Sequence, residues 1–222
     1  MEDIVVTLGK RLGVGMSGVV YDCGKSLMIK VFSFSKRYSE SSNRDRFETC
    51  KSEAKSLRAI EPWFRDLSGV QRLVSMVTFA DGCSMEEGSP LRLQPINDDE
   101  DWKLRPYALL LKSAKGRHIC RKDLSEKTTT EERKQFADFV AEGVRQIVVQ
   151  AHRAGVVHSD LSLNNILIVE NEEHRYRQVM LIDWGFSKRI GESEEAKFEE
   201  DYLACERVWR FLMSPSSLSF FT

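Results

Sequence analysis

The sequence predicts an α+β fold in two lobes, with an antiparallel sheet in the first lobe and a short, mainly helical second lobe. Short apolar runs separated by glycine turns fill residues 4–33 and are typical of antiparallel strands. Residues 130–154 carry apolar side chains at helical spacing, and two strand-like runs follow at 166–170 and 177–182. A chain of 222 residues is long enough to form two small lobes.

Composition indicates an ordinary globular protein. Charged residues make up 30 % of the chain and hydrophobic residues 41 %, with a net charge of −1, so nothing indicates a nucleic-acid or membrane surface. No window approaches the 18 or so uninterrupted apolar residues of a membrane span. The five cysteines are scattered without a Cys-x-x-Cys pair. They predict reduced thiols in an intracellular protein. We expect it in the cytoplasm, or in the cytosol or nucleus of a host cell.

We expect three strands in the first segment, from Ile4 to Leu12, from Val19 to Asp22 and from Leu27 to Phe32. A Gly-x-Gly-x-x-Gly turn separates the first two, and a strand rather than a helix follows it. That order argues against a dinucleotide-binding βαβ unit and for a flap whose backbone can approach phosphates closely. Lys30 stands on the third strand. A solvated lysine is the alternative, but its place after the glycine turn and before a helix makes it a candidate phosphate ligand.

Residues 43–60 are expected to form a helix that ends before Pro62. One face of this helix repeats at helical spacing and comprises Cys50, Glu53, Leu57 and Ile60. Glu53 therefore points inward, whereas Glu48 points outward. Because an unpaired buried charge is costly, we choose Glu53 as the partner of Lys30, with an ordinary surface acid as the alternative.

Residues 73–79 and 107–112 are expected to be the fourth and fifth strands of the first lobe. The region between them, 81–105, contains glycines, prolines and an acidic run, and we interpret it as a surface insertion or a long hairpin without assigned function. The buried run 107–112 is expected to be the edge strand of the sheet and to lead into a hinge.

The helix over 130–154 has the clearest signals in the second lobe. Thr129 and Glu132 offer a capping box at its start, and Gly155 ends it. Its apolar stripe predicts core packing rather than a cofactor site, and comprises Phe136, Val140, Val144, Ile147 and Ala151.

The polar loop after this helix carries the functional interpretation. Asn165 follows Asp160 by five residues, and Asp183 follows the hairpin formed by 166–170 and 177–182. The two feet of this hairpin would hold Asn165 and Asp183 close together. Phosphoryl transfer from ATP needs such groups. One carboxylate orients the hydroxyl, and an amide oxygen and a second carboxylate hold Mg²⁺. A polar loop between two buried strands is the structural alternative.

The run from His158 to Asn165 resembles the His-x-Asp-x-x-x-x-Asn catalytic loop of protein kinases, and Asp183-Trp184-Gly185 resembles their Asp-Phe-Gly. The resemblance to the protein-kinase superfamily extends from about Leu8 to Lys188. It includes the glycine loop, the strand lysine and the helix glutamate in the same order.

This resemblance assigns a role to each candidate residue. Asp160 would orient the acceptor hydroxyl, and Asn165 and Asp183 would bind Mg²⁺. Lys30, held by Glu53, would bind the α- and β-phosphates of ATP. The glycine loop would cover the nucleotide, and adenine would bond to the hinge backbone. The expected nucleotide contacts, besides Lys30, are Gly13, Gly15, Gly18, Val20, Leu111 and Lys112, with the hinge extending to Ser113.

The same resemblance implies one bilobal, protein-kinase-like domain over 1–222, with a small lobe at 1–112 and a minimal large lobe at 113–222. His158 could be a general base, a metal ligand or a structural prop, and the resemblance favours a prop that packs against the metal-binding turn. The other histidines show no ligand spacing with cysteines or acids, so we expect no zinc site.

Several features that depart from the usual kinase pattern are similar to features of the small atypical kinases. Ser162 replaces a common lysine, and no Ala-Pro-Glu follows Asp183. The run Asp160-Leu161-Ser162 is similar to that of RIO kinases. Ser52-Glu53-Ala54-Lys55 and the run from Asp201 to Arg207 are similar to the kinase subunit of the KEOPS tRNA-modifying complex. Several members of that group act more as ATPases than as protein kinases.

We therefore expect an Mg²⁺- and ATP-dependent phosphotransferase that acts on Ser or Thr of a protein substrate. The alternatives are an ATPase switch with a regulatory protein or ribonucleoprotein partner, a small-molecule kinase and a pseudokinase scaffold. Between Phe186 and Glu200 the possible hydroxyl sites are Ser187 and Ser193. Three glutamates surround Ser193 and would repel an added phosphate, so we expect activity without phosphorylation.

Overall fold

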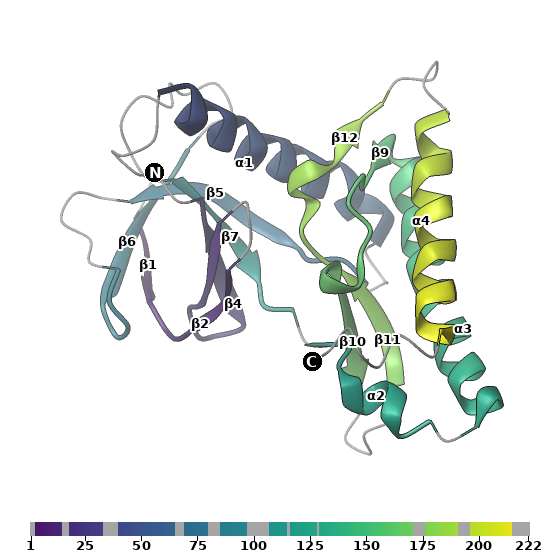
Figure 1. Cartoon of the computed structure of the whole chain (residues 1–222). Coiled ribbons are helices and arrows are strands. Elements are labelled where there is room, and N and C mark those ends of the chain that lie inside the picture. Colours follow the sequence, from purple (N-terminus) through teal and green to yellow (C-terminus); the bar gives the residue numbers. More distant parts are fainter. Residues whose placement is uncertain are drawn as a thin grey trace. The chain divides into compact units, whose positions relative to one another are not determined.

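A computed structural model of the chain describes residues 3–14, 18–32, 40–64, 69–79, 85–96, 107–114, 116–127, 129–170, 176–190 and 196–214. The chain forms two compact units, and helices and strands occur in both (Figure 1). The first unit comprises Met1–Arg58 and Gln71–Ser113, and the second comprises Ala59–Val70 and Ala114–Thr222. The predicted α+β class is confirmed. No helix within the described ranges is long and apolar enough to cross a membrane.

The first unit is built on a seven-stranded antiparallel sheet with the strand order β1-β6-β5-β7-β4-β3-β2. Its strands are β1 (Ile4–Thr7), β2 (Arg11–Val14), β3 (Val19–Asp22), β4 (Leu27–Val31), β5 (Leu73–Phe79), β6 (Pro90–Pro95) and β7 (Tyr107–Lys112). The prediction of five strands is wrong in two places. The first predicted strand is divided into β1 and β2, and β6, which pairs antiparallel with β5, lies in the region interpreted as a surface insertion or a long hairpin.

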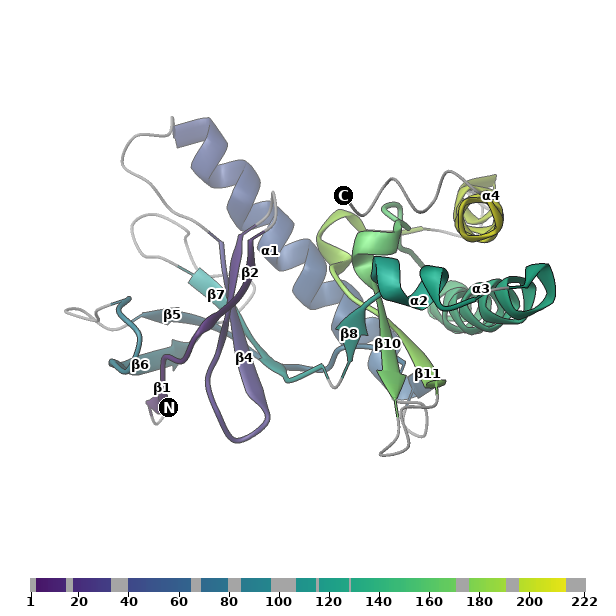
Figure 2. The same ribbon diagram turned by 60° about the horizontal axis from the view of Figure 1, so that its bottom comes forward.

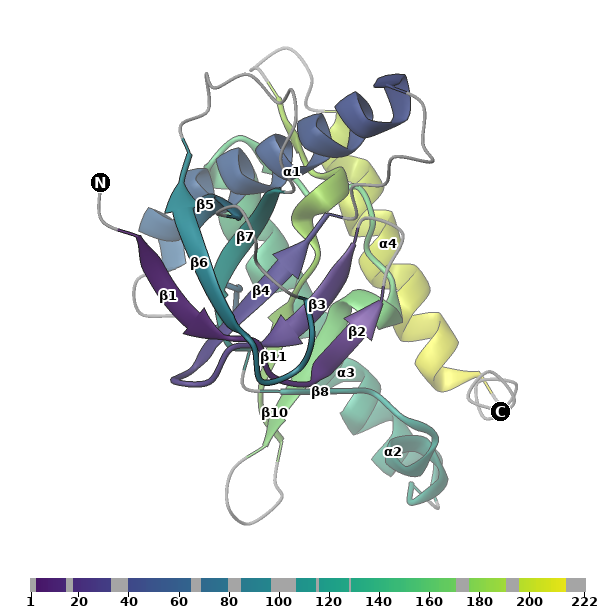
Figure 3. The same cartoon turned by 90° about the vertical axis from the view of Figure 1, so that its left-hand side faces the viewer.

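The division between β1 and β2 closes the sheet on itself (Figure 3). β1 pairs with β6, and β2 pairs with β3. Between them, Leu8 N donates to Ser89 O at 2.9 Å and Gly9 N donates to Asp22 O at 2.7 Å. One continuous run of chain therefore joins both ends of the strand order. The interior is apolar and is filled by Val6, Leu8, Cys23, Ile29, Val77, Phe79, Leu91, Leu93, Ala108 and Leu110.

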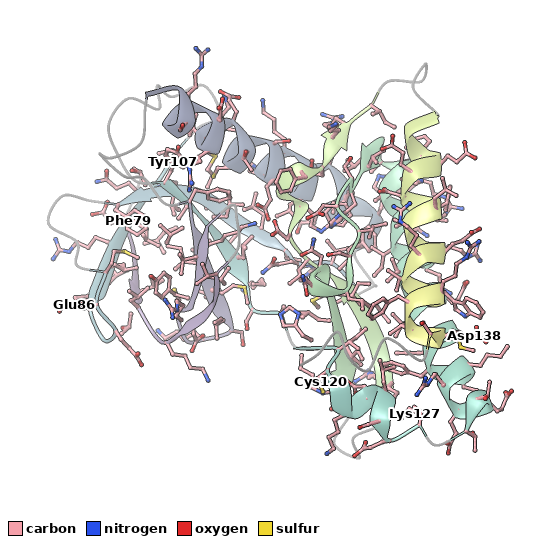
Figure 4. The ribbon with its side chains drawn as sticks, in the orientation of Figure 1. Phe79, Glu86, Tyr107, Cys120, Lys127 and Asp138 are labelled. Atoms are coloured by element: carbon pink, nitrogen blue, oxygen red, sulfur yellow. The ribbon has the colours of Figure 1, made fainter. Side chains whose placement is uncertain are left out.

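Strand β7 is not the edge strand that the sequence predicts, because it pairs with β4 on one side and β5 on the other. All side chains from Tyr107 to Leu111 are buried, as expected for a central strand with both faces covered. Helix α1 (Glu40–Ile60) covers one of these faces. Tyr107, labelled in Figure 4, meets Phe47 of α1 edge to face, with ring centroids 4.8 Å apart.

The second unit contains two long helices, α3 (Thr130–Arg153) and α4 (Ala196–Met213), which lie side by side (Figures 1 and 2). Thr129 Oγ1 accepts a hydrogen bond from Glu132 N at 3.1 Å, and Thr129 N donates to Glu132 Oε2 at 3.0 Å. The predicted capping box is thus confirmed. The predicted apolar stripe of α3 is buried as well. Gly155, with a φ of +69°, ends the helix as predicted.

Short strands and turns connect these helices and position the polar loop. β10 (Ile166–Glu170) pairs with both β11 (Tyr176–Leu181) and β8 (Arg117–His118). β12 (Lys188–Arg189) pairs with β9 (Val156–Val157). The remaining elements are α2 (Arg121–Ser125) and the 3-10 turns η1 (Glu61–Phe64), η2 (Leu163–Asn165) and η3 (Trp184–Phe186).

Candidate functional site

Lys30 and Glu53 form a buried ion pair in the first unit. Lys30 Nζ lies 2.7 Å from Glu53 Oε2, and the two side chains are 6 % and 0 % exposed. The register of β4 and the phase of α1 bring them together, since Glu53 lies on the same helix face as Cys50, Ala54 and Leu57. Glu48, the alternative partner, has a side chain that is 56 % exposed. The structure therefore places the inward acid opposite the strand lysine.

The described glycines of the predicted loop differ in what they do. A Cβ on Gly18 would lie 2.3 Å from Val31 O. The packing of this residue against the end of β4 is therefore sufficient to require a glycine. A Cβ on Gly13 would meet nothing within 4 Å. Gly15 lies outside the described residues. Val20 pairs with Lys30 in the β3–β4 ladder and is partly buried.

Two exposed apolar side chains beside this loop were not predicted as site residues. Leu12 is 46 % exposed and Val14 is 65 % exposed, and both belong to β2. Their positions two residues apart in a strand, next to Gly13, are the sequence signal that could have identified them. They would suit contact with a flat apolar group.

The predicted hinge residues have fewer groups available to bind a nucleotide base than the sequence indicates. The side chain of Leu111 is buried, whereas that of Lys112 is exposed. Lys112 N donates to Arg72 O and Ser113 N donates to Ser26 O, both at 2.8 Å. A base that bonded here would have to displace one of these partners or use a backbone carbonyl.

Asp160 and Asn165 are joined directly in the second unit. Asn165 Nδ2 donates to Asp160 O at 2.8 Å and to Asp160 Oδ2 at 2.9 Å. Asn165 O accepts from Ile182 N at 2.9 Å, which holds Asn165 against the residue that precedes Asp183. The two ends of the β10–β11 hairpin are therefore linked beside the loop that carries Asp160.

Asp183 occupies a left-handed turn, with φ +59° and ψ +72°, a conformation that a short polar side chain tolerates better than a bulky one. Its Oδ1 accepts from Gly185 N at 3.4 Å. The next residue, Trp184, is fully buried and meets the His158 ring edge to face, with centroids 4.6 Å apart. Trp184 thus fixes the turn that presents Asp183.

His158 is a structural prop, because one of its ring nitrogens faces the backbone of its own loop and the other faces the backbone of Ile182, next to Asp183. Nε2 lies 3.1 Å from Ile182 O, which can only accept, so Nε2 carries the proton. Nδ1 accepts from Asp160 N at 3.3 Å. Burial lowers the pKa of this imidazole, which favours the neutral form that the two contacts require. This arrangement excludes the general-base and metal-ligand interpretations.

Asp201 of α4 is the buried acid that sequence reasoning did not assign to the site. Its carboxylate accepts from His158 N at 2.9 Å and from Ser159 N at 3.1 Å. It lies on the apolar face of α4 with Ala204, Cys205, Val208 and Leu212. That phase was visible in the sequence and is the same signal that identified Glu53.

The residues at the hairpin feet have the chemistry that Mg²⁺ requires. The amide nitrogen of Asn165 is bonded to Asp160, so its amide oxygen is the atom left to act as a ligand. Asp183 would add a carboxylate, and hard divalent ions prefer such oxygens. No group of three or more His, Cys, Asp or Glu side chains that could hold a metal occurs among the described residues. Phosphate and water oxygens would complete the coordination, as is common for this ion.

A family model described as protein kinase domain matches residues 100–217, which is more than half of the chain. The chain belongs to the protein kinase domain family. The predicted superfamily is thus confirmed, and the protein is a kinase, a phosphotransferase. A search of curated proteins gave no match. The matched range of the kinase includes Asp160, Asn165, Asp183 and Asp201, whereas Lys30 and Glu53 precede it.

Proposed function

We propose that this kinase transfers the γ-phosphoryl group of Mg²⁺-bound ATP to Ser or Thr of a protein, and that it is of the minimal, atypical type. The observation that carries the proposal is the joined group of the second unit, in which Asn165 holds Asp160 and is itself bonded to the residue before Asp183. We further propose that the chain is one kinase domain over 1–222, with lobes at 1–112 and 113–222.

In the first unit, Lys30 would bind the α- and β-phosphates. Glu53 would hold its ammonium group in place, because the pair is buried and 2.7 Å apart. The backbone around Gly13, Gly15 and Gly18 would lie over the phosphates, and Val20 would contact the nucleotide. Leu111 would contribute through its backbone, since its side chain is buried. Lys112 would contribute through its backbone carbonyl, since its amide donates to Arg72 O.

In the second unit, Asp160 would accept a hydrogen bond from the acceptor hydroxyl. One of its carboxylate oxygens, Oδ2, already accepts from Asn165, which leaves Oδ1 for the hydroxyl. Asn165 and Asp183 would hold Mg²⁺. When bound, this ion would neutralise charge on the phosphates during transfer.

The minimal type is supported by two departures from the usual kinase pattern. Ser162 stands where serine/threonine kinases usually have a lysine, and α4 begins at Ala196, soon after η3 ends at Phe186. The short segment between η3 and α4 supports the ATPase switch as a second candidate, because it reduces the surface available to hold a peptide.

A transfer assay separates the candidates. The purified protein is incubated with Mg²⁺ and γ-labelled ATP, with and without general protein substrates, beside an Asp160→Asn control. Label on Ser or Thr of protein that is lost in the control supports the proposal. Free phosphate alone supports an ATPase, and label on an added small-molecule alcohol supports a small-molecule kinase. The absence of both transfer and hydrolysis would indicate a pseudokinase scaffold.

A further inference from the structure

His152, near the end of α3, is bonded to the same carboxylate that holds the catalytic loop. Its Nε2 lies 3.0 Å from Asp201 Oδ2, and the two side chains are 7 % and 2 % exposed. The roles assigned to the catalytic loop above do not use this histidine.

The carboxylate of Asp201 is bonded to both the loop and helix α3. Oδ1 accepts from Ser159 N at 3.1 Å. Oδ2 accepts from His158 N at 2.9 Å and from His152 Nε2 at 3.0 Å. Ser159 has a φ of +63°, which costs backbone energy in a residue other than glycine, and Asp160 follows it directly. The orientation of this carboxylate therefore bears on the backbone that presents Asp160.

Packing alone does not explain an imidazole at this position. The ring contacts Phe198, with centroids 4.3 Å apart, and Tyr202, with centroids 5.1 Å apart. A phenyl ring could make both contacts. The imidazole also has a cost, because its Nδ1 is buried and no hydrogen-bond partner for it occurs among the described residues. What a phenyl ring could not supply is the hydrogen bond from Nε2 to Asp201.

We infer that His152 is a positioning residue for phosphoryl transfer. It holds the carboxylate of Asp201 in the rotation that receives the amides of His158 and Ser159, and so sets the position of Asp160. The inference rests on the proposed function in one respect, namely that Asp160 is the group that must be positioned. His152 touches neither substrate nor the reacting atoms in this scheme.

Two substitutions separate positioning from packing. His152→Phe retains a ring between Phe198 and Tyr202 but removes the donor. His152→Gln loses the ring and places an amide N–H₂ where Nε2 now lies. We expect His152→Phe to lower kcat by about 10- to 100-fold with little change in the KM for ATP, since displaced catalytic groups cost rate. We expect His152→Gln to recover most of the rate. Phe198→Leu is the packing control. It should lower Tm and have little effect on kcat.

Hydrogen exchange of the His158 and Ser159 amides tests the inference whether or not transfer is detected. These amides should exchange about 10-fold faster or more in His152→Phe than in wild type, with recovery in His152→Gln. Amides near Lys30 serve as the internal control. The inference is overturned if both variants leave amide exchange and kcat at wild-type values. It is also overturned if His152→Gln speeds exchange and lowers kcat as much as His152→Phe does. A wild-type protein without transfer, but with the exchange pattern above, would contradict the proposed function and retain the positioning role.

Discussion

Lys30 Nζ lies 2.7 Å from Glu53 Oε2, with both side chains almost fully buried. Removing one partner of such a pair leaves the other charge buried and uncompensated, which destabilises proteins by several kcal/mol. The pair is therefore a structural element of the first unit as well as the proposed holder of phosphates.

Glu53→Gln should abolish most ATP turnover and lower the free energy of unfolding. Because glutamine retains a hydrogen bond to Lys30, we expect a loss of about 2 kcal/mol rather than the full cost of an unpaired charge. ATP turnover and urea unfolding measure the two effects. Glu48→Gln is the matched control on the exposed face of α1 and should change neither quantity. If the control were the damaging variant, the assignment of Glu53 would be wrong.

Asp160→Asn should retain nucleotide affinity and lose transfer. In the proposed function the carboxylate would act on the acceptor hydroxyl, and positioning and base effects of this kind contribute roughly 10²–10⁴ in rate. Calorimetry with Mg²⁺-ATP and a single-turnover transfer assay would show the two outcomes separately. Wild-type transfer by this variant would refute the catalytic assignment of Asp160.

Asp183→Asn should weaken ATP binding in Mg²⁺ but not in EDTA. Asparagine also tolerates the left-handed conformation and can still accept from Gly185 N, so the turn should be preserved while the negative ligand is lost. Titrating Mg²⁺ at fixed ATP is the measurement. An affinity that follows Mg²⁺ as in wild type would indicate that Asp183 only stabilises the turn.

Arg117→Met should destabilise the second unit in a pH-dependent manner. Arg117 binds Asp123 through two hydrogen bonds of 2.6 and 2.7 Å and also reaches Glu170 on β10. Cys120 and Lys127, labelled in Figure 4, flank the short helix α2 that carries Asp123. Since Asp123 is buried and Arg117 partly exposed, we expect a loss of about 1–3 kcal/mol at pH 7.

The sign of the pH dependence follows from Asp123. Burial alone would raise the pKa of this carboxyl, but hydrogen bonds from Arg117 and from the Cys120 amide lower it below its usual value. The stabilisation is therefore present above the unfolded pKa of about 3.9 and is lost as the pH falls through the lower folded pKa. Denaturation midpoints of wild type and variant should differ at pH 7 and converge below about pH 4. A constant difference across this range would contradict the pairing.

The kinase should be active without phosphorylation of the segment between η3 and α4. Ser187 is buried, and its hydroxyl donates to Trp184 O, so a kinase could not reach it in the folded state. Ser193 lies outside the described residues, among three glutamates. Protein produced with a phosphatase and verified by mass should turn over ATP as fast as the Ser187→Ala/Ser193→Ala variant. Activity that arises only after modification of this segment would disprove the expectation.

The sequence by itself determined the features that depend on periodicity and local chemistry. The capping box at Thr129, the apolar stripe of α3 and the inward phase of Glu53 follow from spacing along one element. The glycine loop and the order of Lys30, Glu53, Asp160, Asn165 and Asp183 together indicated a kinase. In each case the information lies in the spacing of residues along an element or in their order along the chain.

Tertiary structure decided which faces meet and which polar groups find partners. Periodicity shows that one side of a strand or helix is buried, but not against what, so the central place of β7 and the pairing of β6 with β1 were not predicted. The bonds from Asp201 to the His158 and Ser159 amides join residues more than forty positions apart. Such a bond has no local signature, because it forms only when α4 packs beside α3 and the loop that carries Asp160 in the folded chain.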